Sequence, residues 1–354
     1  MTKVNHKELK EQIKIAYDTK TPIFIWGTTG IGKSDSVKAV AKEIAKEEGL
    51  GFSDEDVENG CFGFIDIRIS QLEPSDLRGL PTIDKDRTKW LIPNWLPKNP
   101  TGKGILFFDE INLSPPSIQA TAYQLILDRK LGDYKLPDGW VIVSAGNRVE
   151  DKCNVFEMSS ALCNRFTHTE LNIPDKDAWT NWALDNGIDN RIIAFLQFKP
   201  SSLFQFDSKN KDRAFPTPRS WAFCSRLIQG REDKAMLNIL VSSAVGEATA
   251  TEFCAFLRLQ NKIDIKELIK NPKLVANIKE IDLKYILLGT IAEYYRNDKT
   301  LLEKTFELCE YLEPEFAVLL LRFLKGTNQS HFSKTIVNDK KGKELLNRYS
   351  EILN

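Results

Sequence analysis

Residues 26–35 read WGTTGIGKSD, and this stretch decides the fold that the sequence predicts. Gly27, four further residues, and then Gly32, Lys33 and Ser34 satisfy the pattern G-x-x-x-x-G-K-[ST]. In such a loop, glycines let backbone N–H groups converge on phosphate oxygens, the lysine bridges the outer phosphates, and the serine hydroxyl holds Mg²⁺. The nucleotide-binding residues that we expect are Gly27, Thr28, Thr29, Gly30, Ile31, Gly32, Lys33, Ser34 and Asp35.

The residues on either side of this loop supply the context that its chemistry requires. Residues 22–26 (PIFIW) form a short, almost wholly apolar run of the kind that a buried parallel strand needs. After the loop, apolar residues recur at helical spacing from Val37 to Ala45, and Gly49 is placed to end that helix. The order is therefore strand, glycine loop, helix.

Further strand-like runs follow in the first half of the chain. They lie at residues 62–69, 105–108, 140–146 and 166–171, and with residues 22–26 they make five expected strands. Their alternation with helical segments predicts an α/β fold with a parallel sheet covered on both faces. One of these helices should begin at Pro115, with Ser114 as its cap. Two hairpin-like inserts are expected, at about residues 79–96 and 128–140.

The strand signals disappear in the second half of the chain. From about Pro174 onward, amphipathic helical segments take over, so we place a boundary within residues 172–177 (NIPDKD). We therefore expect an α/β nucleotide-binding core over residues 1–173 and a helical region over residues 174–354. The last hundred residues show the pattern of packed helices, and nothing in them indicates a ligand.

Polar side chains follow two of the expected strands at the point where each strand ends. In residues 104–112 (GILFFDEIN), an apolar strand runs directly into Asp109 and Glu110, at the carboxyl edge of the sheet where the glycine loop also lies. We expect Asp109 to hold Mg²⁺ and Glu110 to polarise an attacking water. Asn147 follows the next strand, and its amide can hydrogen-bond both a γ-phosphate and that water without adding charge.

Taken in order, these motifs resemble the AAA+ ATPases, and among them the MoxR-type group related to dynein-like AAA modules. The resemblance covers roughly residues 20–230 and rests on GTTGIGKSD, DLRGLP, GILFFDEIN, AYQLILDRKLG, AGNR, ALCNRF and AFPTPRSW. It implies a P-loop NTPase core with Walker A and Walker B motifs, followed by an all-helical lid. The two inserts then resemble the helix 2 insert and the pre-sensor 1 insert of this group.

The same resemblance implies roles for three residues beyond the loop. Asn147 would be the sensor 1 residue, and Arg165 an arginine finger that reaches the γ-phosphate of the neighbouring subunit. Arg219 would be the sensor 2 residue of the lid. Arg219 follows Thr217 and Pro218, which predict the cap and first position of a helix. The positive end of the helix dipole repels a cation in the first turn of a helix. The position of Arg219 therefore favours an anion nearby.

Composition limits the remaining functional classes. Over 354 residues, Lys plus Arg equal Asp plus Glu at 49 each, so no overall charge favours nucleic acid. The six cysteines show no zinc spacing and indicate reduced thiols. The N-terminus lacks a signal-like apolar segment, and no apolar run is long enough to span a bilayer, so we expect a cytoplasmic protein.

Three uses of ATP remain open at this point. An arginine supplied by a neighbour implies a shared site in a closed ring, most often of six subunits in this family. The resemblance then favours a chaperone that remodels or assembles a protein partner, commonly a von Willebrand factor A domain protein. The alternatives are a scaffold without turnover and a nucleic-acid motor or loader with a pore lined by Arg78, Lys85, Arg87, Lys89, Lys130 and Lys135.

GTP is a weaker candidate nucleotide than ATP. Residues 76–79 (DLRG) and 261–264 (NKID) match two GTPase patterns. Residues that read guanine should follow a strand of the nucleotide-binding sheet, and the second match lies deep in the helical half of the chain. We therefore regard both as chance matches and expect ATP and Mg²⁺ as the ligands.

Overall fold

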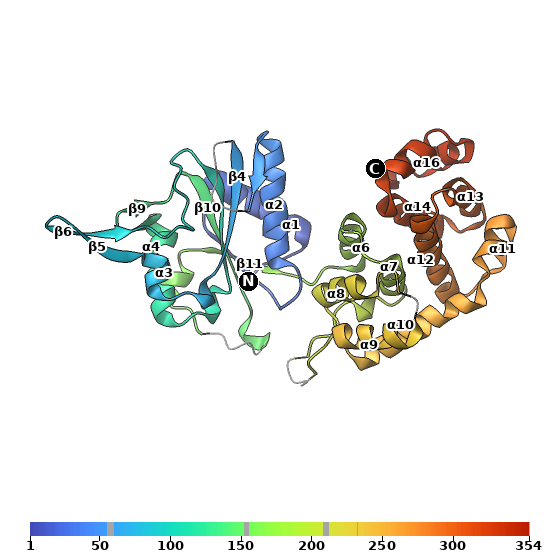
Figure 1. Cartoon of the computed structure of the whole chain (residues 1–354), viewed down its shortest axis with the longest axis horizontal. Helices are drawn as coiled ribbons and strands as arrows, with labels where there is room; N and C mark the ends of the chain where they lie inside the picture. Colours follow the sequence, from blue (N-terminus) through green and yellow to red (C-terminus); the bar gives the residue numbers. More distant parts are fainter. Residues whose placement is uncertain (55–59, 152–155, 208–211, 232, 354) are drawn as a thin grey trace. The chain divides into compact units, whose positions relative to one another are not determined.

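Figure 1 shows the computed structural model, which describes all residues except 55–59, 152–155, 208–211, 232 and 354. The chain divides into two compact units, Met1–Ile173 and Pro174–Asn354. The first unit is α/β, whereas the described residues of the second unit form helices and connecting loops. Each unit has its own hydrophobic core.

The first unit is built around a seven-stranded sheet in the order β1-β11-β2-β10-β7-β4-β3. All neighbouring strands in it are parallel. The strands are β1 (Lys3–Val4), β2 (Ile23–Trp26), β3 (Gly51–Ser53), β4 (Cys61–Arg68), β7 (Lys103–Asp109), β10 (Gly139–Gly146) and β11 (Thr167–Leu171).

The expectation of five strands in this sheet was wrong. The five predicted strands are present as β2, β4, β7, β10 and β11, but β1 and β3 extend the sheet at its two edges. These extra strands have only two and three residues. Such short segments show no alternating pattern, and their pairing depends on distant partners, as when Lys3 lies opposite Glu170. Local sequence therefore could not reveal them.

Helices cover both faces of the sheet. As Figure 1 shows, α1 (His6–Thr19) and α2 (Lys33–Glu47) lie on one side, and α3 (Pro74–Arg78) and α4 (Pro116–Asp128) lie on the other. Successive strand residues point to opposite faces. Phe62 therefore contacts Tyr17 of α1, with ring centroids 5.3 Å apart, while Leu106 and Phe108 pack in one cluster with Leu125 of α4.

Helix α4 begins one residue later than the sequence predicts. Pro115 is its cap and Pro116 its first residue, while Ser114 ends the short turn η2 (Ile111–Leu113). The residue before a proline is restricted to extended conformations, so Pro115, which precedes Pro116, cannot itself take helical geometry easily. The other short segments of this unit are η1 (Ile69–Gln71), η3 (Val149–Asp151) and α5 (Ser160–Cys163).

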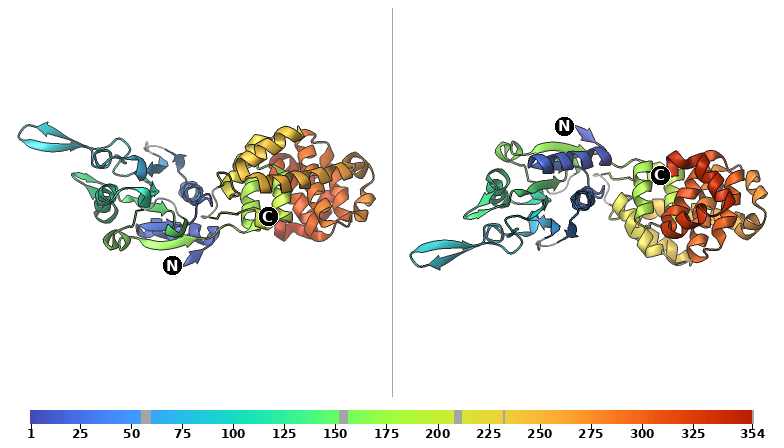
Figure 2. Two further views of the ribbon diagram at one scale, coloured as in Figure 1. Left: turned by 90° about the horizontal axis from the view of Figure 1, so that it is seen from below. Right: turned by 90° about the horizontal axis from the view of Figure 1, so that it is seen from above.

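Two antiparallel hairpins complete the first unit. They are formed by β5 (Leu80–Asp84) with β6 (Arg87–Leu91) and by β8 (Lys130–Leu131) with β9 (Tyr134–Lys135). The β5–β6 hairpin extends away from the sheet of this unit, as the views in Figures 1 and 2 agree. Ile83, near its tip, is 86% exposed.

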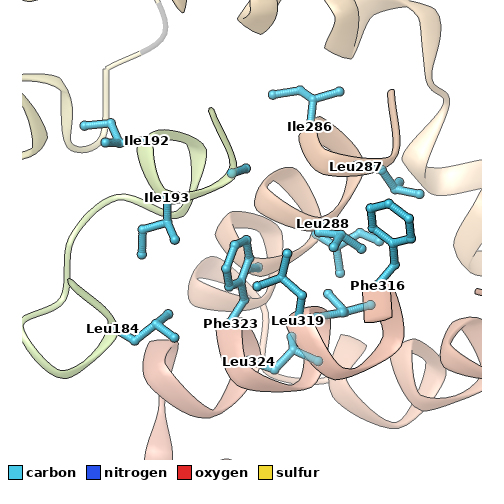
Figure 3. Close-up of a cluster of buried hydrophobic side chains, with 14 of the residues drawn as sticks. Leu184, Ile192, Ile193, Ile286, Leu287, Leu288, Phe316, Leu319, Phe323 and Leu324 are labelled. Atoms are coloured by element: carbon cyan, nitrogen blue, oxygen red, sulfur yellow. The ribbon is translucent and has the colours of Figure 1, made fainter. Parts of the chain in front are cut away.

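The second unit packs its helices around one large apolar cluster. Figure 3 shows part of it, with side chains from α6, α7, α12 and α14 facing one another. Its elements are α6 (Lys176–Asp185), α7 (Asn190–Phe198), η4 (Pro200–Ser202), α8 (Pro218–Ile228), α9 (Lys234–Val245), α10 (Glu247–Arg258), η5 (Leu259–Lys262), α11 (Ile265–Lys270), η6 (Pro272–Asn277), α12 (Ile281–Asn297), α13 (Leu301–Leu308), η7 (Cys309–Tyr311), α14 (Pro314–Thr327), α15 (Gln329–Ile336) and α16 (Lys340–Leu353).

Two expectations about the whole chain can be compared with the described residues. None of the helices in these residues has the length and apolar character needed to cross a membrane. Five cysteines, at positions 61, 163, 224, 254 and 309, carry free thiols. Cys153 lies outside the described residues.

Candidate active site

The carboxyl ends of three adjacent strands meet at one edge of the sheet in the first unit. Strand β2 leads into the loop that starts at Gly27, β7 ends at Asp109, and β10 ends directly before Asn147. The register aligns Gly146 of β10 with Trp26 of β2. Ligands of open parallel sheets bind at this edge, so the groups predicted for one site do lie at a suitable place.

The backbone of the glycine loop adopts conformations that favour glycine. Gly30 and Gly32 have φ angles of +76° and +91°, in the left-handed region that favours glycine. Gly27 donates its N–H to the carbonyl of Gly146 over 3.3 Å, which ties the start of the loop to β10. A Cβ at Gly27 would lie 2.8 Å from Ile31 Cδ1. The loop therefore folds tightly over the end of the sheet and leads into α2.

Helix α1 also contacts this loop. His6, the first residue of α1, donates from Nε2 to the carbonyl oxygen of Ile31 over 2.9 Å. Its ring lies close enough that a Cβ at Gly32 would be 3.8 Å from the same nitrogen. The sequence predicts no function for His6, because a single histidine ahead of the loop carries no recognisable spacing. The structure places it as a support for the loop backbone.

Lys33 connects the loop to the end of β10. Its Nζ donates to the carbonyl oxygens of Gly27 and Thr28 over 2.7 and 2.9 Å, and to Oδ1 of Asn147 over 3.0 Å. Asn147 is only 7% exposed. The ammonium group of the loop and the amide predicted to sense the γ-phosphate therefore lie within hydrogen-bond distance of each other. Thr28 is also buried, at 2% exposure, and its Oγ1 has no hydrogen-bond partner among the described residues.

Ser34 and Asp109 form the second contact between predicted site residues. Ser34 Oγ donates to Asp109 Oδ2 over 3.0 Å. A hydroxyl and a carboxylate are hard oxygen donors, which Mg²⁺ prefers, and Mg²⁺ usually takes only one or two protein ligands beside phosphate oxygens. The donor set therefore fits Mg²⁺. Ser34 also lies in the first turn of the 15-residue helix α2, whose N-terminus favours an anion.

Glu110 has a strained backbone. Its φ and ψ angles are +56° and +34°, in the left-handed region that residues other than glycine seldom adopt. Such a conformation costs about 1–3 kcal/mol and occurs preferentially at functional sites. Glu110 directly follows β7 and precedes η2, and its side chain is half-buried.

Asn112 is a site residue that sequence reasoning missed. It is 1% exposed, and its Nδ2 donates to the carbonyl oxygen of Asn147 over 2.7 Å. A Cβ at Gly146 would lie 2.4 Å from Asn112 Oδ1, so Gly146 provides the space for this contact. The amide thereby joins the turn after Glu110 to the end of β10. The only signal in the sequence is a polar residue two positions after the acid pair.

Arg165 lies in the first unit, directly after α5, and its contacts are not with the loop. Its guanidinium carbon is 3.5 Å from the ring centroid of Tyr123, and its Nη1 donates to the carbonyl oxygen of Ala161 over 2.9 Å. The residue is half-buried. Sequence reasoning did not single out Tyr123, because one aromatic on an amphipathic helix is an ordinary packing residue.

Arg219 belongs to the second unit. It is exposed at the second position of α8, after Pro218. The predicted cap is present, because Thr217 Oγ1 accepts a hydrogen bond from the Ser220 N–H over 3.0 Å. The local part of the prediction is therefore confirmed, and the assignment of Arg219 as a sensor stays a prediction.

His168 links β2 to the segment that carries Arg165. Trp26 Nε1 donates to His168 Nδ1 over 3.0 Å, and His168 Nε2 lies 2.7 Å from the carbonyl oxygen of Cys163. Because indole can only donate, Nδ1 is the acceptor and the hydrogen resides on Nε2, which donates to Cys163. The strand that enters the glycine loop is thus connected through one imidazole to the end of α5.

Asp66 is a third carboxylate near Asp109. Asp66 lies on β4, two residues before Arg68 and on the same face of the sheet. Arg68 lies opposite Asp109 in the register of β4 and β7. Desolvation of the Asp66 carboxyl raises its pKa from the usual 3.8 to about 6, and the charge of Asp109 contributes to the rise. A carboxyl whose pKa is raised in the folded state contributes stability fully below about pH 3.8, and this stability is lost as the pH rises through 6.

We therefore expect Asp66→Asn to stabilise the protein above pH 6. The residue as a whole is exposed, so solvent screening limits the gain to less than about 1 kcal/mol. Urea unfolding from pH 3.5 to 8 should show the difference between the parent and the variant growing with pH and vanishing near pH 4. Asp133→Asn, in the exposed turn between β8 and β9, is the matched control. A difference that does not change with pH would contradict the assignment.

Comparisons with known proteins give only distant structural likenesses. No protein-family model and no curated protein matches the chain. NtrX from Brucella abortus in complex with ATP is 12% identical, with 98% of this chain and 68% of that chain covered and a TM-score of 0.39. A RuvB mutant of Thermotoga maritima is 15% identical, with 75% and 74% covered and a TM-score of 0.37. At such values these likenesses support no particular activity, which has to follow from the side chains themselves.

Proposed function

We propose that this chain is a Mg²⁺-dependent AAA+ ATPase of the MoxR-like type, which works as an oligomeric ring on a protein partner. One observation carries the ATPase assignment. At the carboxyl edge of the sheet, Lys33 contacts Asn147 and Ser34 contacts Asp109. These pairs bring together the cation, the amide, the hydroxyl and the carboxylate that ATP hydrolysis requires.

Binding of the phosphates follows from the loop and the start of α2. Lys33 Nζ has three oxygen acceptors within 3.0 Å, and phosphate oxygens are stronger acceptors for an ammonium group than amide oxygens are. Backbone N–H groups of the glycine loop and the N-terminus of α2 add positive potential. Ser34 and Asp109 would hold Mg²⁺, which neutralises charge on the β- and γ-phosphates when it is bound.

Hydrolysis requires a group that orients and deprotonates water. Glu110 follows Asp109 directly and is held by a backbone conformation that costs energy, which supports a catalytic assignment. Its carboxylate would accept the proton of the attacking water. Asn147, anchored through its own carbonyl to Asn112, would hydrogen-bond the γ-phosphate and the water. Arg219, in the helical unit, stays the residue that we propose as sensor 2.

The proposed ring depends on the role of Arg165. This residue contacts Tyr123 and Ala161 on its own chain, and we propose that its guanidinium completes the site of the neighbouring copy. An arginine supplied in this way contributes about 10³–10⁵ to the rate in other phosphoryl-transfer enzymes. If each copy supplies its arginine to the next, a closed ring completes every site, and six subunits is the number that the resemblance favours. The protein partner would be a von Willebrand factor A domain protein.

Mixing two inactive variants tests the shared site. Glu110→Gln should lower turnover about 10²- to 10⁴-fold, and Arg165→Ala about 10³- to 10⁵-fold, so that each variant alone keeps only a small residual rate. In mixed rings, an interface that pairs an intact Glu110 with an intact Arg165 regains activity, and random one-to-one mixing makes about one interface in four of this kind. We expect about a quarter of the parent ATPase rate at saturating ATP and Mg²⁺.

A double variant provides the control for this experiment. Rings that mix Arg165→Ala with the double variant Glu110→Gln/Arg165→Ala lack Arg165 in every subunit. Their ATPase activity should therefore not be rescued. Absence of rescue in mixed rings whose formation is verified by cross-linking would contradict the shared site. Full turnover by a strictly monomeric Arg165→Ala variant would do so as well.

A nucleic-acid motor is the second candidate, because the β5–β6 hairpin exposes three basic side chains. Lys85, Arg87 and Lys89 are all exposed on this hairpin. Binding of phosphate backbones is strongly weakened by salt. Stimulation of the ATPase by single-stranded DNA or RNA at low salt, lost as salt rises, would favour this candidate over the protein remodeller.

A further inference from the structure

Tyr123 and Arg165 form a stacked pair that no motif predicts. Tyr123 lies on α4, half-buried at the edge of the apolar layer between α4 and the sheet. With Leu162 it also lines a cleft of about 700 Å³. The guanidinium carbon of Arg165 lies 3.5 Å from the centroid of its ring. This distance is typical of a direct cation–π contact.

The charge of Arg165 is held without a carboxylate. Among the described residues, no Asp or Glu lies within ion-pair distance of Arg165, and its hydrogen-bond acceptor is the Ala161 carbonyl. Its Nε atom is buried and has no hydrogen-bond partner among the residues that the structure describes. The face of the Tyr123 ring and one carbonyl oxygen therefore hold the side chain, and among the described residues no ion pair holds it.

Arg148 shows the opposite arrangement and serves as a comparison within the same unit. Its guanidinium forms ion pairs with Asp151 over 2.8 Å and with Glu170 over 3.0 Å. The hydrogen bonds with these acids raise its pKa further above the usual value. A carboxylate partner competes with any incoming phosphate, whereas an aromatic ring does not neutralise the cation. Of these two arginines, Arg165 is therefore the one that can bind an anionic group from another molecule.

We propose that Tyr123 is a positioning residue, whose ring holds the guanidinium of Arg165 in the orientation in which it enters the active site of the neighbouring copy. This inference rests on the proposed supply of Arg165 to that site. A flexible arginine side chain would lose conformational entropy each time the transition state forms. Contact with the aromatic ring of Tyr123 restricts that side chain in advance. The contact uses the ring rather than the hydroxyl, so phenylalanine should replace tyrosine.

The test compares variants with and without a ring at position 123. We expect Tyr123→Leu to lower kcat about 5- to 30-fold, the range that corresponds to a well-formed cation–π contact. Affinity for ATP should change less than about twofold, because Arg165 acts on the transition state and the loop binds the ground state. Tyr123→Phe should keep kcat within about twofold of the parent. Tyr123→Met is made alongside, in case the leucine variant does not fold.

A double-variant cycle separates positioning from packing. If Tyr123 acts through Arg165, adding Tyr123→Leu to Arg165→Ala should cause no further loss of kcat. A further loss of the same size as in the parent background would overturn the proposal, because Tyr123 would then act independently of Arg165. Parent-like kcat in a folded Tyr123→Leu or Tyr123→Met variant would overturn it too.

Failure of this inference can be distinguished from failure of the proposed function. If Arg165→Ala abolishes turnover and Tyr123→Leu does not lower it, only the positioning by Tyr123 is wrong. If Arg165→Ala keeps full turnover, the shared site itself is wrong, and the inference about Tyr123 is overturned with it. Thermal unfolding and sedimentation of each variant show whether a loss of kcat comes from the fold or from ring assembly.

Discussion

Lys33→Ala should lower the affinity for ATP by at least about a hundredfold. The substitution removes the only side-chain ammonium that contacts both the glycine loop and Asn147 among the described residues. Hydrogen bonds to charged groups contribute about 1.5–3 kcal/mol each, and two phosphates would lose their shared cation. Titration with a fluorescent ATP analogue, with and without Mg²⁺, measures the loss.

Lys38→Ala is the matched control for this experiment. Lys38 lies on the same helix, about one turn further on, and pairs at the surface with Asp54 over 2.9 Å. Its loss changes the net charge in the same way but should leave ATP affinity nearly unchanged. Micromolar affinity retained by Lys33→Ala would contradict the assignment of the glycine loop as a phosphate site.

Glu110→Gln should separate binding from turnover. Glutamine keeps the size of the side chain but cannot take a proton from water, so we expect turnover to fall about 10²- to 10⁴-fold. ATP should still bind, because Lys33, Ser34 and Asp109 are unchanged. The variant should therefore retain ATP and hold the ring together, which sedimentation in the presence of ATP and Mg²⁺ would show.

The control for Glu110→Gln is the same substitution at Glu150, an exposed residue of η3. Glu150→Gln should hydrolyse ATP at the parent rate. Unchanged turnover in Glu110→Gln would exclude Glu110 as the base. A parent protein that binds ATP without hydrolysing it would instead support the scaffold without turnover.

The sequence predicted those parts of the fold that depend on local patterns. Residues 22–26 and 105–108 are apolar runs, and each forms a strand that ends at the predicted edge. The glycine pattern and the start of its helix lie within one short consecutive stretch, which is why the loop could be placed from sequence. The function of Lys33 stays a prediction that the experiment above addresses, and the functions of Asp109 and Asn147 stay predictions as well.

The remaining features depend on contacts between distant segments. Strands β1 and β3 pair with partners that no local pattern identifies. No local pattern identifies the contacts of Asn112 and Tyr123 either. Asn112 packs against Gly146, and the ring of Tyr123 packs against Arg165, which lies far along the chain. Side chains of this kind resemble ordinary packing residues until the fold brings their partners together.

Strand β1 protects an edge of the sheet and leads directly into α1. Lys3 and Val4 cover the outer side of β11, and α1 then begins with His6, which supports the backbone of the glycine loop. Deletion of Lys3 and Val4 would uncover the polar backbone at the outer edge of β11 and leave it free to pair with strands of other molecules. Because α1 follows β1 directly, such a deletion would also disturb the backbone of the glycine loop, which His6 supports.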